Sequence, residues 1–175
     1  MKKIVSALLS LIFLFSINVN AEEKLTIEKQ LVGIVGAISG TVKTETRELK
    51  AGDQIYLNET IYAGPGSGTQ ILLLDQSTFT VGEDSEVVMD TFVFDPETND
   101  GKIVASVKQG SLKVISGLIS KKNPDSLTVE VPEGTLGSRG TEFQTIVSKG
   151  KTDTLLIGPG KNNTLGMRPG AVLVG

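Results

Sequence analysis

The feature that most limits the fold of this chain is an alternation of apolar and polar residues, broken by frequent turn signals. After residue 30, Val, Ile and Thr recur with a period of two, and Gly, Asn, Asp or Pro interrupt them roughly every 8–12 residues. No long window has the spacing of an amphipathic helix. The pattern predicts β-strands over residues 34–44, 54–63, 70–74, 78–81, 86–94, 102–108, 111–116, 127–131, 141–147, 154–157 and 171–174.

The strand pattern also predicts how the sheet is covered. The run Ile71-Leu72-Leu73-Leu74 is apolar on both faces, which is typical of a strand covered on both sides. Gln109-Gly110-Ser111 separates two alternating runs and suits a tight hairpin. We therefore expect a single all-β domain with two packed antiparallel layers, either a β-sandwich or a solenoid-like roll.

The N-terminus has the pattern of a secretory signal peptide over residues 1–21. Two lysines precede an apolar run over residues 4–17, and small residues stand at the cleavage positions up to Ala21. The run is shorter than the roughly 20 residues that a transmembrane helix needs. We expect a cleaved signal, with an uncleaved anchor as the alternative, and a periplasmic or secreted chain without a membrane span. A polar lead-in over residues 22–30 would then precede a β domain over residues 31–175.

Composition excludes several kinds of site. The chain has no Cys and no His, which removes the usual zinc and copper ligands and the Ser-His and Cys-His nucleophile pairs. The formal net charge of −3 becomes −5 once the two lysines of the signal are removed, and a nucleic-acid-binding protein needs a basic face instead. We expect no metal, no cofactor and no nucleic-acid partner.

An acidic segment leaves an enzymatic alternative open. A solvated face is the default interpretation, and the spacing of a calcium-binding EF-hand is absent. Two opposed carboxylates are what a carbohydrate-active enzyme would require. The carboxylates of this segment are Asp84, Glu86, Asp90, Asp95, Glu97 and Asp100.

Arg139 lies among glycines, between Gly137 and Gly140, just before a predicted strand. Flanking glycines permit a sharp turn, and a guanidinium offers five donors and no acceptor. We expect the side chain to turn inward and bind carbonyls or a carboxylate such as Asp75 or Asp90. The alternative is an outward arginine that holds an anionic ligand.

An ordered set of segments resembles the FecR domain family over about residues 33–175. The family's domain of this type is periplasmic and all-β, and its best-known members regulate iron-uptake signalling. The sequence departs from the family at Gln76, where Gly is usual, and at Val131, where Thr is common. The segments are residues 49–55 (LKAGDQI), 60–64 (TIYAG), 70–77 (QILLLDQS), 81–87 (VGEDSEV), 110–113 (GSLK) and 131–143 (VPEGTLGSRGTEF).

The resemblance implies a structural motif and one candidate reaction. Some membrane-bound members self-cleave at a Gly-Thr bond, and here the corresponding pair is Gly140-Thr141, where the Thr hydroxyl would attack the preceding carbonyl. The residues assigned to the structural motif are Asp75, Gly137, Arg139, Gly140, Thr141 and Phe143.

The favoured function is a non-enzymatic exported module that binds an envelope protein or glycan, in signalling or assembly. The alternatives are a small carboxylate-dependent carbohydrate-active enzyme and a structural or adhesive element of a larger assembly.

Overall fold

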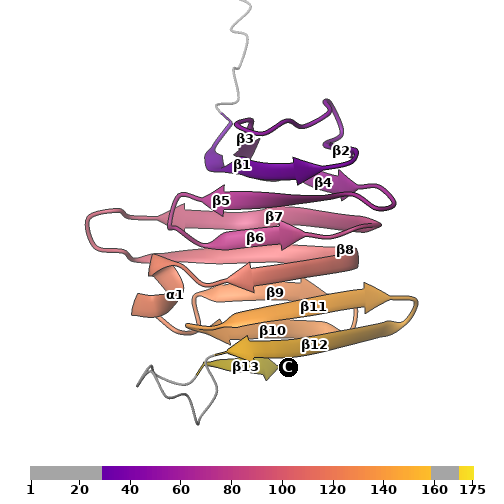
Figure 1. The fold of residues 1–175 in the computed structure, drawn as a ribbon. Helices are drawn as coiled ribbons and strands as arrows, with labels where there is room; N and C mark the ends of the chain where they lie inside the picture. The colour runs from indigo at the N-terminus through magenta and orange to yellow at the C-terminus, as the bar shows by residue number, and fades with distance from the viewer. Residues whose placement is uncertain (1–28, 159–169) are drawn as a thin grey trace, which may run out of the picture.

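The structure is a computed structural model that describes residues 29–158 and 170–175, and it is built almost entirely of β-strands (Figure 1). The expected signal peptide over residues 1–21 and most of the lead-in lie outside this range. Within it, no helix is both long and apolar enough to cross a membrane. The elements are β1 (Leu31–Ser39), β2 (Val42–Lys43), β3 (Gln54–Tyr56), β4 (Thr60–Ala63), β5 (Gly68–Leu73), β6 (Thr78–Val81), β7 (Ser85–Phe94), β8 (Gly101–Ile115), α1 (Leu118–Lys122), β9 (Leu127–Val131), β10 (Gly134–Arg139), β11 (Glu142–Ser148), β12 (Lys151–Gly158) and β13 (Ala171–Val174).

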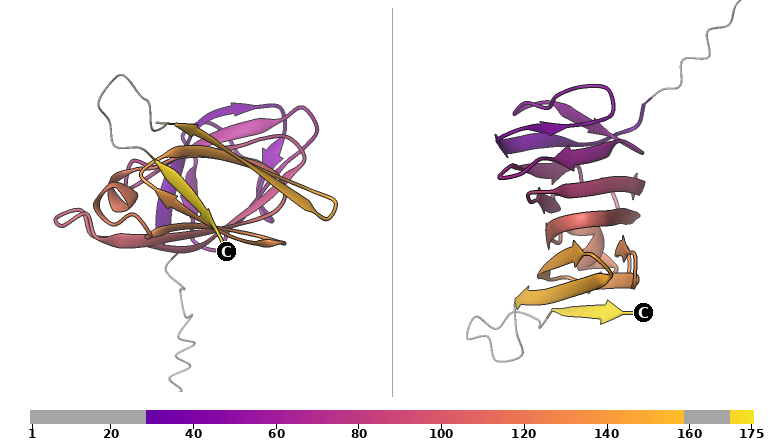
Figure 2. Two further views of the ribbon diagram at one scale, coloured as in Figure 1. Left: turned by 90° about the horizontal axis from the view of Figure 1, so that it is seen from below. Right: turned by 90° about the vertical axis from the view of Figure 1, so that its right-hand side faces the viewer.

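All of these strands belong to one sheet, which curls into a half-barrel (Figure 2). Arm A has the order β3-β1-β5-β6-β8-β11-β12, and arm B has the order β2-β4-β7-β8-β9-β10-β13. Every pairing is antiparallel except that between β8 and β9. The expected all-β, largely antiparallel single domain is confirmed, and its two arms are joined through β8.

One hydrophobic core fills the inside of the curl. Alternate side chains of both arms point inward, as Phe79 and Val81 of β6 and Leu127 and Val129 of β9 illustrate, and all four are at most 1 % exposed. A strand side chain alternates faces with a period of two, so one face of each arm meets the core and the other meets solvent.

The outer face of β5 corrects one expectation. Ile71 and Leu73 point into the core, whereas Leu72 and Leu74 are 48 % and 45 % exposed. The prediction that this apolar run is covered on both sides is therefore wrong. A single curled sheet encloses only one core, so the second apolar face stays at the surface.

The expected hairpin at residues 109–111 is also wrong, because β8 runs without a break from Gly101 to Ile115. Its first half pairs with β7 and β9 in arm B, and its second half pairs with β6 and β11 in arm A. Gly110 sits at the change of arm with a φ of +82°. A Cβ built there would lie 2.2 Å from the Ser85 hydroxyl oxygen, so only glycine fits this position without a rearrangement.

Candidate functional site

Asp75 connects the turn between β5 and β6 by hydrogen bonds to α1, the only helix of the described residues. Its side chain is fully buried and accepts hydrogen bonds from the Ser77 N–H (3.0 Å), the Ser77 hydroxyl (2.8 Å) and the Ile119 N–H (3.4 Å). The Asp75 carbonyl accepts from the Leu118 N–H at 2.8 Å. Asp75 therefore joins the β5–β6 turn to the start of α1.

Arg139 does not play the internal role expected of it. Its side chain is 48 % exposed and pairs with Asp125, which is 69 % exposed, through contacts of 3.0 and 3.4 Å. The reason is strand alternation, because Leu136 and Ser138 occupy the inward positions of β10 and Arg139 must face out. Neither Asp75 nor Asp90 is its partner.

Serine hydroxyl groups form the internal hydrogen bonds that were expected of the Arg139 guanidinium. Ser116 lies 2.9 Å from the Ser138 hydroxyl and donates to the Thr141 carbonyl at 2.8 Å. Ser120 donates to the Ser138 carbonyl at 3.1 Å and accepts from the Gly140 N–H at 3.2 Å. Ser120 and Ser138 are fully buried, so these neutral groups satisfy the backbone of the 138–141 segment inside the fold.

The remaining motif residues surround this cluster. Gly140 has a φ of +59°, which favours glycine, whereas a Cβ on Gly137 would meet only the Cβ of Leu173 at 3.8 Å. Phe143 is fully buried in β11. The Thr141 hydroxyl donates to the carbonyl of Gly158 at 2.6 Å. In this arrangement the candidate nucleophile points to another strand and has no carboxylate or amine as a hydrogen-bond partner among the described residues.

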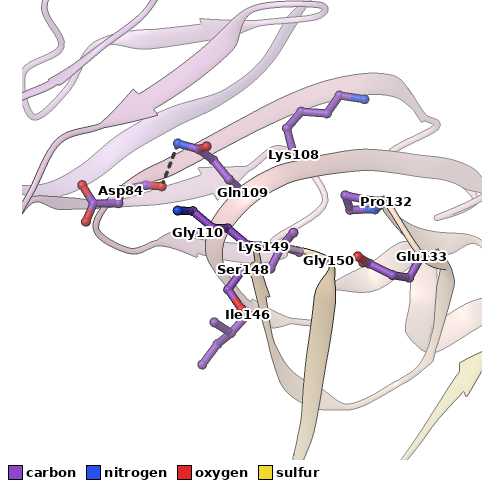
Figure 3. Close-up of a pocket in the computed structure, with 11 residues that line it drawn as sticks. Asp84, Lys108, Gln109, Gly110, Pro132, Glu133, Ile146, Ser148, Lys149 and Gly150 are labelled. Carbon is purple, nitrogen blue, oxygen red and sulfur yellow. Dashed lines mark hydrogen bonds between the residues drawn. The ribbon is translucent and has the colours of Figure 1, made fainter.

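A groove of about 560 Å³ lies where β8 changes arm (Figure 3). The bend of β8 at Gln109 and Gly110 forms part of it. Three turns also contribute: the β6–β7 turn at Asp84, the β9–β10 hairpin at Pro132 and Glu133, and the β11–β12 hairpin around Lys149. Gln109 is held by its amide, which donates to the Asp84 carbonyl at 3.2 Å.

The groove combines apolar side chains with charges of both signs. Ile146, which is 47 % exposed, and Pro132 supply apolar surface. Lys108 and Lys149 are exposed and form no ion pair within the described residues. Asp84 and Glu133 also line the groove, and Glu133 accepts a hydrogen bond from the Thr152 hydroxyl.

The acidic segment does not assemble into one site. Asp84 lines the groove, whereas Asp90 accepts from the Ser106 hydroxyl at 2.6 Å. Asp95 and Asp100 stabilise a turn: a hydrogen bond from the Thr98 hydroxyl lowers the pKa of Asp95, and one from Lys122 lowers the pKa of Asp100. No group of three or more acidic residues in residues 29–158 and 170–175 is arranged to hold a metal ion.

Sequence reasoning missed the groove and the buried serines. The groove joins residues from the β6–β7 turn to the β11–β12 turn that only the fold brings together. The serines had a weak signal, because Leu136 and Ser138 keep the alternation of a strand through residues 134–139. The glycines of that segment suggested a turn instead.

Comparison with known proteins identifies the family. The model of the family described as FecR protein matches residues 59–157, from the start of β4 to the end of β12. β1, β3 and β13 lie outside the matched range but pair with strands of the same sheet. No curated protein and no solved structure matches the chain. The family match covers more than half of the sequence, and the chain therefore belongs to the FecR family.

Proposed function

We propose that this chain is an exported, non-enzymatic binding module, periplasmic or secreted, that holds a segment of an envelope protein in the groove at the β8 bend. FecR domains are typically non-catalytic. The observation that carries the proposal is the groove's combination of an apolar surface at Ile146 and Pro132 with free cations and anions around it. Ligand sites commonly join apolar walls to a few placed polar groups.

The charges favour a polypeptide over a polyanion. Lys108 and Lys149 attract a carboxylate, but Asp84 and Glu133 repel one that extends along the groove. A protein segment carries both signs and apolar side chains, so it can match all of these groups. An acidic glycan matches only the lysines.

Charge reversal tests the proposal. The double variant Lys108→Glu/Lys149→Glu changes two exposed side chains of the groove. Lys43→Glu/Lys102→Glu makes the same charge change at exposed positions outside it. Each chain would be crosslinked in cell envelopes and its partners identified by mass spectrometry. We expect the parent and the control to retain one partner that the groove variant loses, and binding to weaken as salt increases. A partner that all three chains retain equally, or a partner that is a glycan, would refute the proposal.

A further inference from the structure

The two ends of the curled sheet close the core in different ways. At the β2 and β3 end, the loop over residues 44–53 folds across the core. Leu49 in this loop is 3 % exposed and donates its N–H to the Val42 carbonyl at 2.8 Å. Its neighbours Glu48 and Lys50 are exposed. This loop is a polar cap of the kind that stacked β structures need at their ends.

The opposite end is formed by the edge strands β12 and β13 (Figure 1). These strands carry exposed apolar side chains. Among the described strands, β12 pairs only with β11, and β13 pairs only with β10. Each strand therefore presents an edge that another strand can extend. The exposed apolar residues are Leu155 (64 %), Leu156 (40 %), Ile157 (44 %), Leu173 (46 %) and Val174 (76 %).

A crevice of about 240 Å³ lies between these two edges. Among the described residues it is lined by Val131, Leu136 and Val174, together with Gly134 and the polar residues Glu133, Thr152 and Thr154. Val174 pairs with Leu136, which points into the core, so the Val174 side chain also faces inward. Leu156 pairs in the same way with buried Phe143.

We propose that this end docks against the same end of a second copy of the chain. A single peptide strand would complete one edge and leave the other edge and the crevice open. A second copy offers two edges at the same spacing and the same crevice between them. A two-fold axis perpendicular to the strands makes β12 antiparallel to its copy and β13 antiparallel to its copy.

The charges of the two edge strands do not oppose this pairing, and Glu133, a carboxylate that lines the crevice, accepts a hydrogen bond from Thr152 of β12. Lys151 and Asp153, the two charged residues of β12, bind each other at 2.8 Å, and β13 carries no charge. An unpaired charge on an edge strand would meet its own copy near the two-fold axis and repel it. The crevice shares Glu133 with the groove of the proposed function. The two proposals are tested separately, because Lys108 and Lys149 do not line the crevice and Leu156 and Val174 do not line the groove.

Sedimentation equilibrium over a range of protein concentrations tests the dimer, with the chain expressed without residues 1–21, the expected signal peptide. Leu156→Lys/Val174→Lys places lysines at inward positions that are already 40 % and 76 % exposed, so the monomer tolerates them, whereas the dimer would bury four ammonium groups. Leu72→Lys/Val93→Lys is the matched control, at exposed positions (48 % and 58 %) away from this end. We expect the parent and the control to dimerise, and the dissociation constant of the edge variant to rise by about tenfold or more.

A second measurement needs no variant. Amide hydrogen exchange of β12 and β13 in the parent should slow as the protein concentration rises, while exchange in the loop over residues 44–53 should not change. A parent that stays monomeric, exchange that is independent of concentration, or a dimer that the edge variant leaves intact would each overturn the proposal. Capture of a different protein at this end in place of the second copy would overturn it as well.

Discussion

Replacing Asp75 with alanine is expected to destabilise the fold much more than replacing Arg139 with alanine. The Asp75 carboxylate is fully buried and binds the Ser77 N–H and hydroxyl at 3.0 and 2.8 Å. Its contact with the Ile119 N–H is longer, at 3.4 Å. Arg139 instead forms an ion pair at the surface with Asp125.

The magnitudes follow from what each substitution leaves behind. Asp75→Ala strands two buried donors of Ser77, at about 1–3 kcal/mol each, and the weak contact with Ile119 adds little. We expect a loss of about 2–6 kcal/mol in the free energy of unfolding. Arg139→Ala removes an exposed ion pair, which typically contributes about 0–1 kcal/mol.

Thermal and urea unfolding followed by circular dichroism would measure both effects. About 2–4 °C per kcal/mol is typical for a domain of this size, so Asp75→Ala should lower Tm by roughly 4–24 °C and Arg139→Ala by roughly 4 °C at most. Asp75→Asn keeps one acceptor oxygen for Ser77 and should fall between them. An Arg139→Ala variant that loses as much stability as Asp75→Ala would refute this account of the site.

Three further predictions concern the bend, the hydroxyl cluster and pH. Gly110→Ala should destabilise the chain by about 2 kcal/mol or more in urea unfolding, because the added Cβ would overlap Ser85. Gly150 is the control, since it also has a positive φ but has open space around it. Gly150→Ala should cost about 1 kcal/mol. Ser116→Ala should cost about 1–3 kcal/mol by calorimetry, since it removes the hydroxyl that accepts from the buried Thr141 N–H, whereas the Thr141 carbonyl keeps its hydrogen bond from the Ser116 N–H. The pKa of Asp95 is lowered from 3.8 in the folded chain, so its contribution to stability is present above that pH and is lost as the pH falls through the lowered pKa. Asp95→Asn should therefore flatten the acid limb of stability against pH, and an unchanged limb would contradict this.

Much of the fold could be predicted from the alternation of apolar and polar residues alone, because a two-residue period shows which side chains lie on the same face of a strand. Residues 78–81, 127–131 and 171–174 were predicted as strands and have those bounds in the structure. Alternation does not state which strands become neighbours. The β8 bend was read as a hairpin for this reason, since a glycine between two alternating runs suits either geometry.

The candidate site was less predictable than the strands. The glycines that flank Arg139 suggest a turn and so an inward side chain. Gly137 instead belongs to β10, only Gly140 lies beyond its end, and the alternation of Leu136 and Ser138 decides the direction of Arg139. The groove depends on three turns whose proximity follows from the curl of the sheet. The distances between these turns depend on packing between residues far apart in the sequence, which no short segment determines.

The continuity of β8 has a consequence for how the molecule unfolds. Its two halves supply neighbours to β7 and β9 on one side and to β6 and β11 on the other. If β8 separates from its neighbours in one arm, the core that the two arms share becomes exposed. The chain should therefore unfold in one cooperative step. Protease cleavage near Gly110 should unfold both arms and leave no stable fragment.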